Sequence, residues 1–223
     1  MTTANESPNL EIAPKSTANH VRIFLSSPGD VVAEREAARV LVKEALPVHP
    51  MRGKLTLELI SWDDPYTAVP LDAGTSPQAA VNRYRPRPSE CDIAVVVLWS
   101  RMGTPLPDTW QKSGGGRFGS GTEWEYEDAV ASKACTVLVY QRTEKPQVDL
   151  DDPELQTKQG QYQDVLAFCK RIETNGGVNR YPTADDFRQL LQQHLLELLS
   201  KRLAAFVPAG AERLCVPPAY EAQ

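Results

Sequence analysis

The chain has 223 residues, of which 41% are hydrophobic and 24% are charged, and its formal net charge is −5. This composition is typical of a globular protein, and the negative charge disfavours a broad surface for nucleic acids or anionic membranes. The longest unbroken apolar stretch, residues 93–99, is far shorter than the roughly 20 residues that span a bilayer, so we expect no transmembrane helix.

The two ends of the chain differ in composition from its centre. Residues 1–19 are polar and lack the basic start and apolar centre of a secretory signal, which predicts a disordered tail and a cytoplasmic protein. Residues 207–223 are rich in Pro and Ala, as in a linker to a further domain. One domain is expected over residues 20–206. The four scattered cysteines and three dispersed histidines predict reduced thiols and no metal site.

The first predicted unit is a strand, a turn and a helix. A β-prone run at residues 21–25 leads into turn-forming residues 26–30, and a helix is expected over residues 33–45 with Asp30 as its N-cap. The solvent face of this helix is expected to carry Glu34, Arg35 and Glu36.

A second unit follows, and then a central strand. Alternating leucines predict a strand at residues 55–59, which runs into the polar segment 62–65. Ser76 and Pro77 predict the start of a short helix that ends near Tyr84. Residues 92–98 are almost wholly apolar and β-branched, which is typical of a parallel strand covered on both faces.

The remaining elements are predicted by the same signals. A long, Gly-rich loop over residues 100–120 precedes a helix at 121–130 and a strand at 136–140. After a polar loop at 141–158, the last expected elements are a helix at 162–172, a short strand at 178–181 and a helix that Thr183 caps.

Alternating strands and helices predict a flavodoxin-like α/β fold, a three-layer sandwich with a mainly parallel sheet of about five strands. Right-handed crossovers place the strand ends and the following helix starts at one edge of such a sheet, where ligands bind. That edge gathers residues 26–30, 62–64, 99–101 and 120–125.

These segments offer hydroxyls, backbone amides, carboxylates and tryptophans, which suit a ribose with an attached flat ring. The candidate substrate-binding residues are Ser26, Ser27, Pro28, Asp64, Trp99, Ser100, Gly121 and Thr122. A structural interpretation stands beside this one, in which the serines form only a tight turn and the tryptophans only pack. The chain contains no P-loop and no Gly-x-Ser-x-Gly motif, which argues against a P-loop nucleoside triphosphatase and a serine hydrolase of the nucleophile-elbow type.

Three segments in order carry a family resemblance: residues 24–35, 91–105 and 120–129. Over residues 21–140 the chain resembles the TIR-like domains found N-terminal to bacterial STAND/NACHT ATPases, distant relatives of nucleoside 2-deoxyribosyltransferases. The resemblance implies a TIR-like version of the predicted fold.

The resemblance also implies a catalytic residue. In the transferase relatives, a glycine is followed four positions later by the catalytic glutamate and eight positions later by alanine, and Gly121, Glu125 and Ala129 match this spacing. Glu123 and Glu127 remain alternatives if the alignment slips. Helical spacing places those two on one face and Glu125 on the other, and the motif favours Glu125.

The implied activity is hydrolysis of the N-glycosidic bond of NAD+ or a related nucleotide, with NAD+ as substrate and no separate cofactor. The resemblance further implies self-association, a covalently attached sensor or ATPase domain, and a role in bacterial antiphage defence. Two alternatives remain: a non-catalytic signalling or nucleotide-binding module, and a nucleoside deoxyribosyltransferase-like enzyme.

Overall fold

The computed structural model describes residues 19–48, 52–62 and 85–206 of the chain. Its centre is a parallel sheet in the order β2-β1-β3-β4-β5. The five strands are β1 (His20–Ser26), β2 (Thr56–Ser61), β3 (Ile93–Leu98), β4 (Thr136–Arg142) and β5 (Val178–Tyr181). The predicted flavodoxin-like α/β fold with a five-stranded sheet is confirmed.

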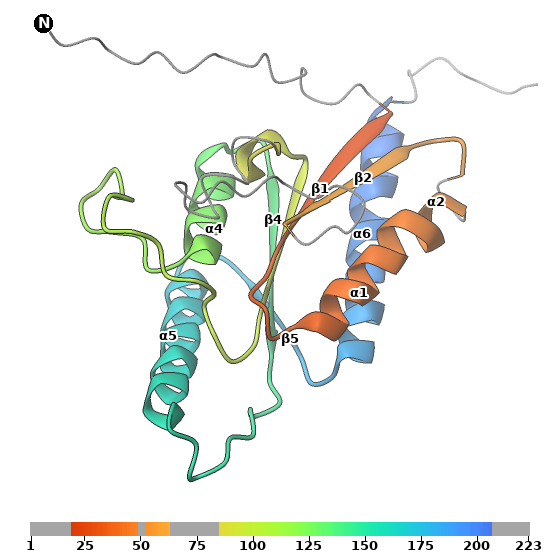
Figure 1. Cartoon of the computed structure of the whole chain (residues 1–223). Coiled ribbons are helices and arrows are strands. Elements are labelled where there is room, and N and C mark those ends of the chain that lie inside the picture. The colour runs from red at the N-terminus through yellow and green to blue at the C-terminus, as the bar shows by residue number, and fades with distance from the viewer. Residues whose placement is uncertain (1–18, 49–51, 63–84, 207–223) are drawn as a thin grey trace, which may run out of the picture.

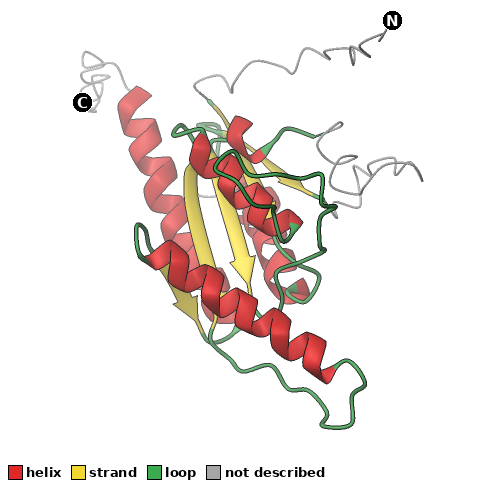
Figure 2. Ribbon diagram, turned by 90° about the vertical axis from the view of Figure 1, so that its left-hand side faces the viewer, coloured by secondary structure: helices red, strands yellow, loops and turns green. Residues whose placement is uncertain are grey.

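Helices cover both faces of this sheet and make three layers (Figures 1 and 2). The face formed by α1 and α6 shares one hydrophobic cluster with the sheet, and two further clusters lie on the face of α4 and α5. The helices are α1 (Val32–Val40), which continues through the π-helical η1 (Leu41–Ala45) into α2 (Leu46–Val48), then the 3-10 turn η2 (Pro88–Glu90), α4 (Gly121–Ala131), α5 (Leu155–Glu173) and α6 (Ala184–Phe206).

Residue alternation along the strands assigns each side chain to one face. Ile23 and Leu25 pack into the cluster on the α1 and α6 side, whereas Phe24 packs on the α4 side. Ser26 has the parity of Phe24, so the end of β1 presents its hydroxyl toward α4. All six residues of β3 are buried, which confirms the prediction of a central strand covered on both faces.

Three local predictions need correction. Asp30 is not a side-chain N-cap, because α1 begins after Val31 without a side-chain cap bond, and the Asp30 carboxylate bonds elsewhere. Glu34 and Arg35 are buried, with 0% and 7% of their surfaces exposed, so they do not lie on a solvent face. Helix α5 begins at Leu155 and not near residue 162. The prediction missed its first two turns because they are polar and carry no apolar periodicity.

Other local predictions are confirmed. The strand at Val178–Tyr181 has the predicted bounds, and the hydroxyl of Thr183 accepts a hydrogen bond from the Asp186 amide at the start of α6. The predicted helix at residues 76–84 and the candidate residue Asp64 lie outside the described residues.

Candidate functional site

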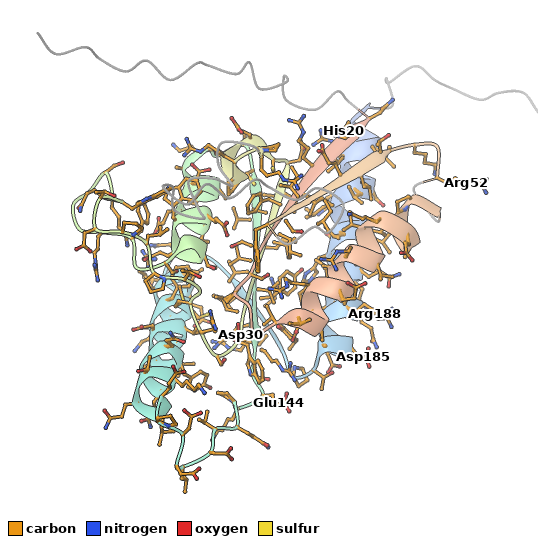
Figure 3. The ribbon with its side chains drawn as sticks, viewed as in Figure 1. His20, Asp30, Arg52, Glu144, Asp185 and Arg188 are labelled. Carbon is orange, nitrogen blue, oxygen red and sulfur yellow. The ribbon has the colours of Figure 1, made fainter. Side chains whose placement is uncertain are left out.

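The candidate site lies at the carboxyl edge of the sheet, at the point where the strand order reverses. The chain passes from β1 to β2 on one side and returns to β3 on the other side of β1, so the loops after β1 and β3 diverge at the carboxyl edge of the sheet. Ligands of doubly wound folds bind in this crevice. Figure 3 shows Asp30 and Glu144 at this end of the molecule and His20 at the opposite end.

Asp30 ties the two loops together. Its Oδ2 atom accepts hydrogen bonds from the backbone amide and from the hydroxyl of Ser100, both at 2.8 Å. Two donors on one carboxylate oxygen hold the loop after β3 against the loop after β1. The predicted site residue Ser100 therefore fixes the shape of the crevice through its own backbone and side chain.

A buried serine–glutamate pair lies on the α4 side of this edge. Ser26, the last residue of β1, donates its hydroxyl to Glu125 Oε2 at 2.5 Å, and the two residues expose only 1% and 6% of their surfaces. The two predicted site residues are 99 positions apart in sequence. Their contact joins the carboxyl end of β1 to α4.

Helix α4 has a well-defined start. Ser120 accepts a hydrogen bond from the Glu123 amide at 3.1 Å, and the Gly121 amide donates to the Thr104 carbonyl at 3.1 Å. These bonds satisfy helix-terminal groups that otherwise lack partners. They also fix the register of the helix and so direct Glu125 toward β1.

Gly103 brings the two loops and α4 into close approach. Its φ is +96°, and a Cβ on it would lie 2.9 Å from Thr122 Oγ1 and 4.0 Å from Pro28 Cβ. The predicted site residues Pro28 and Thr122 therefore meet around a glycine that the sequence analysis did not select. The positive φ and the missing side chain both require glycine here.

The two candidate tryptophans each have an arginine over the ring. The Arg142 guanidinium lies 4.3 Å from the ring centroid of Trp99, and that of Arg35 lies 5.1 Å from the ring centroid of Trp62. The Trp62 indole donates to the Ser27 carbonyl at 3.1 Å, so Trp62 adjoins the serine turn.

Trp99 belongs to a different part of the molecule from Glu125. It packs against the cluster on the α1 and α6 face, and its indole donates to the Glu144 carbonyl at 2.8 Å. The structure thus brings together Ser26, Ser27, Pro28, Gly121, Thr122 and Glu125, and places Trp99 on the other face of the sheet.

A second buried carboxylate, Glu34, lies on that other face. Its Oε1 atom accepts hydrogen bonds from Arg142 and from the Tyr181 hydroxyl, both at 3.2 Å. Burial raises the pKa of Tyr181, and the nearby charge of Glu34 raises it further, so the phenol stays protonated. This cluster links α1 to the ends of β4 and β5. No local sequence signal indicated it, because Glu34 stands in a charged run that is typical of a solvent face.

The three glutamates of α4 divide between two faces, as helical spacing predicted. Glu125 faces β1, whereas Arg171 of α5 bonds both Glu127 at 2.7 Å and Glu123 at 3.1 Å. Glu123 also accepts from Lys112 at 2.7 Å and from the Gly119 amide at 2.8 Å.

Burial by itself would raise the pKa of Glu123 above its ordinary value. Hydrogen bonds from Lys112 and the Gly119 amide, with the positive charges of Lys112 and Arg171, outweigh burial, so the net pKa lies below the ordinary glutamate value. Glu123 is therefore held as a carboxylate.

Lys112 is held in place by a small hairpin within the Gly-rich loop. Gln111 bridges Arg117, and the Phe118 amide donates to the Trp110 carbonyl at 3.0 Å. The ring of Trp110 meets that of Trp124 edge to face with centroids 5.3 Å apart. This contact attaches the hairpin to α4.

A cleft of about 380 Å³ opens on the outer side of α4, between the loop after β3 and α5. Glu123 lines it, and Glu125 does not. The lining residues are Met102, Gly103, Pro105, Gly119, Ser120, Glu123, Gln161, Asp164, Ala167, Phe168 and Arg171.

Metal ions and membranes each require a particular arrangement of residues. Within residues 19–48, 52–62 and 85–206, no three His, Cys, Asp or Glu side chains are grouped so that they could hold a metal ion. None of the helices in that same part of the chain has both the length and the apolar character that a membrane crossing requires.

Comparison with known proteins places the chain in a family. A search of curated proteins found no match. One family model matches residues 22–196, which includes most of β1, the whole of α4 and most of α6. The chain therefore belongs to the family described as a domain of unknown function, DUF4062.

Proposed function

We propose that the protein is a TIR-like domain that hydrolyses the N-glycosidic bond of NAD+ or a related nucleotide, with Glu125 as the essential carboxylate. The observation that carries the proposal is the 2.5 Å hydrogen bond from Ser26 to Glu125 at the switch point of the sheet. It supports the proposal because the strand-end serine and the motif glutamate, which the sequence analysis expected at one edge of the sheet, meet where folds of this kind bind nucleotides.

The chemistry requires a negative charge near the ribose. When the bond between C1′ and the pyridinium nitrogen breaks, the nitrogen keeps the electron pair and leaves as neutral nicotinamide, and positive charge develops on C1′. A carboxylate stabilises this oxocarbenium-like centre. Water then adds to C1′ and releases a proton. In this proposal Glu125 stabilises the charge, and Ser26 positions Glu125 by donating to Oε2.

The biological setting is proposed from the resemblance of residues 21–140 to TIR-like domains. It comprises activation by self-association, an attached sensor or ATPase domain, and antiphage defence in the bacterial cytoplasm. Activity therefore has to be measured both in the free protein and in a clustered form.

The test is NAD+ turnover, followed by chromatography, in the wild type and in Glu125→Gln. Both proteins are assayed at high concentration and as fusions to an oligomerising tag. Glutamine preserves the shape of the side chain and an oxygen that accepts from Ser26, so we expect a folded protein with turnover reduced by about 10²–10³-fold or more.

Glu127→Gln is the matched control, because Glu127 is on the same helix and bonds Arg171 on its outer face. This variant should turn over NAD+ like the wild type. Nicotinamide release that persists in Glu125→Gln, or its absence from the clustered wild type, would refute the proposal.

A non-catalytic nucleotide-binding or signalling module is the second candidate. The observation that favours it is burial: Glu125 exposes 6% of its surface and accepts a buried hydrogen bond, as a purely structural link between α4 and β1 would. Under this alternative Glu125→Gln leaves nucleotide binding and assembly unchanged, and neither protein releases nicotinamide.

A further inference from the structure

Two cysteines that are far apart in the sequence lie together at the amino edge of the sheet, on the side of α4. Cys91 precedes β3 and is buried in a hydrophobic cluster, with 4% of its surface exposed. Cys135 precedes β4, is half-buried and packs against the same cluster, to which α4 contributes Ala129. The two cysteines are not bridged to one another. Their thiols therefore share one environment without a covalent link.

A backbone hydrogen bond joins the direct neighbours of the two cysteines. The amide of Thr136 donates to the Asp92 carbonyl at 2.9 Å, next to the first pair of the β3 and β4 register. Because neighbouring strands lie about 4.8 Å apart, this bond brings the Cα atoms of Cys91 and Cys135 close to the roughly 4.4–6.8 Å that a disulfide requires. The sulfur atoms are also near one another, since a charge on Cys135 raises the pKa of the Cys91 thiol.

Turns hold both cysteines in place. The Cys91 amide donates to the Pro88 carbonyl at 3.1 Å, and the Cys91 thiol donates to the Arg87 carbonyl at 3.4 Å. The Cys135 amide donates to the Ser132 hydroxyl at 3.1 Å. A covalent bond between residues that are already fixed in this way requires little further ordering of the chain.

The two thiols differ in their access to solvent. Burial, and after it the charge of Cys135, raises the pKa of Cys91, so this thiol stays protonated and shielded from solvent. Cys135 is half-buried and is the thiol that a dissolved oxidant reaches first. An accessible cysteine beside a second one that can resolve it is the usual arrangement of an oxidisable pair.

We propose that Cys91 and Cys135 are a modification site, at which a hydroperoxide converts the two thiols into a reversible disulfide. The Cys135 thiolate attacks one oxygen of hydrogen peroxide and the O–O bond breaks. Cys135 becomes a sulfenic acid, and the hydroxide released takes up the proton that the Cys135 thiol lost.

The sulfur of Cys91 completes the reaction by attacking the sulfur of Cys135. The S–O bond breaks, and the hydroxide leaves as water with the proton of Cys91. Two thiols have then lost two electrons, and the peroxide has been reduced to two molecules of water. An added dithiol reverses the modification by thiol–disulfide exchange.

The bridge has a measurable effect on stability. It closes the loop of residues 91–135, which contains β3 and the whole of α4. A cross-link that closes a long loop restricts the unfolded chain and so stabilises the folded state. The oxidised protein should therefore unfold at a higher temperature than the reduced one.

The test uses the full chain, which is first reduced and then treated with hydrogen peroxide. Remaining thiols are blocked with N-ethylmaleimide, and digestion without reductant followed by mass spectrometry locates linked peptides. We expect a peptide that links Cys91 to Cys135 and disappears with dithiothreitol. The midpoint of thermal unfolding should be higher by about 5 °C or more in the oxidised protein than in the reduced protein.

Three variants assign the effect to the pair. Cys135→Ser should abolish both the linked peptide and the rise in the midpoint, and Cys91→Ala should leave Cys135 as a sulfenic acid that dimedone labels. Cys169→Ala is the matched control, because Cys169 is a buried cysteine of α5 in a different hydrophobic cluster. This variant should keep both the linked peptide and the rise in the midpoint.

Two results would overturn the inference. One is the absence of a peptide that links Cys91 to Cys135 after peroxide treatment of the wild type. The other is a linked peptide without a rise in the unfolding midpoint, since the bond would then not fit the folded protein. The measurement involves no nucleotide, so its outcome is independent of the proposed hydrolysis.

Discussion

The two faces of α4 place carboxylates in opposite surroundings within a single turn of helix. On the inner face, Glu125 is buried against β1 and accepts a hydrogen bond from the Ser26 hydroxyl. On the outer face, Glu123 borders a cleft and accepts from the cationic side chains of Lys112 and Arg171. The inner carboxylate is thus buried and bonded to a strand-end hydroxyl, whereas the outer one borders a cleft and is bonded to charged groups.

Glu123 and Glu125 are therefore suited to different structural roles. A carboxylate bound by two cations has its charge compensated and mainly holds elements together, here the hairpin, α4 and α5. The hydroxyl of Ser26 joins the buried Glu125 to the end of β1, so the inner pair holds α4 against the sheet at its carboxyl edge.

The largest expected effect on stability follows from removing the inner hydroxyl. Ser26→Ala takes a donor from a buried carboxylate, and a buried polar group that loses a partner costs about 1–3 kcal/mol. Ser120→Ala removes the N-cap of the same helix, and a cap of this kind contributes about 1 kcal/mol. Urea unfolding of both variants should therefore show the larger loss for Ser26→Ala.

Ser120→Ala is the matched control, since it deletes the same hydroxyl from a residue that is equally buried and also bonds α4. An equal or larger loss for Ser120→Ala would contradict the comparison. It would mean that α4 is held by its start and not by the pair that Glu125 forms.

The fold was predictable because its signals are local and repeated. The apolar, β-branched run that forms β3 is typical of a covered parallel strand, and the acidic start after Thr183 marked the last helix. The start of α5 was missed because residues 155–161 are polar on all sides, so they show no apolar stripe in the sequence.

Only part of the site could be predicted, and the limit is physical. Strand ends and helix starts meet at one edge of a parallel sheet, so Ser26 and Glu125 could be expected near one another from topology alone. The bond between Asp30 and Ser100 spans 70 positions, and that between Glu34 and Arg142 spans 108. Such long-range pairs follow from the packing of whole elements and leave no pattern in the neighbouring sequence.

The boundary between the two faces can be tested at Gly103. Gly103→Ala forces alanine into a left-handed conformation, which costs about 1–2 kcal/mol, and it places a Cβ 2.9 Å from Thr122 Oγ1. We therefore expect lower stability than that of the wild type in thermal or urea unfolding.

Gly114→Ala is the control for Gly103→Ala. A Cβ there meets nothing within 4 Å, and the residue is exposed in the hairpin, so its stability should match that of the wild type. Full stability of Gly103→Ala would show that the loop after β3 does not press against α4.

The smallest expected effect is the pH dependence that Glu123 contributes. Burial raises its pKa, but the hydrogen bonds from Lys112 and the Gly119 amide and the charges of Lys112 and Arg171 outweigh burial, so the pKa in the folded protein lies below the ordinary value of 4.5. A depressed pKa stabilises the folded state fully above 4.5, and this contribution is lost as the pH falls through the lower folded value. Lys112→Met removes one of these cations and should flatten the corresponding part of the stability profile below 4.5.

Lys145→Met removes the same charge from an exposed site in the loop after β4, and it should leave the dependence of stability on pH below 4.5 as it is in the wild type. If the stability of Lys112→Met falls with pH below 4.5 as steeply as that of the wild type, the hairpin does not hold Glu123 in solution. The outer face of α4 would then be an open carboxylate surface, and it would differ from the inner face only in that Glu125 is buried and Glu123 is not.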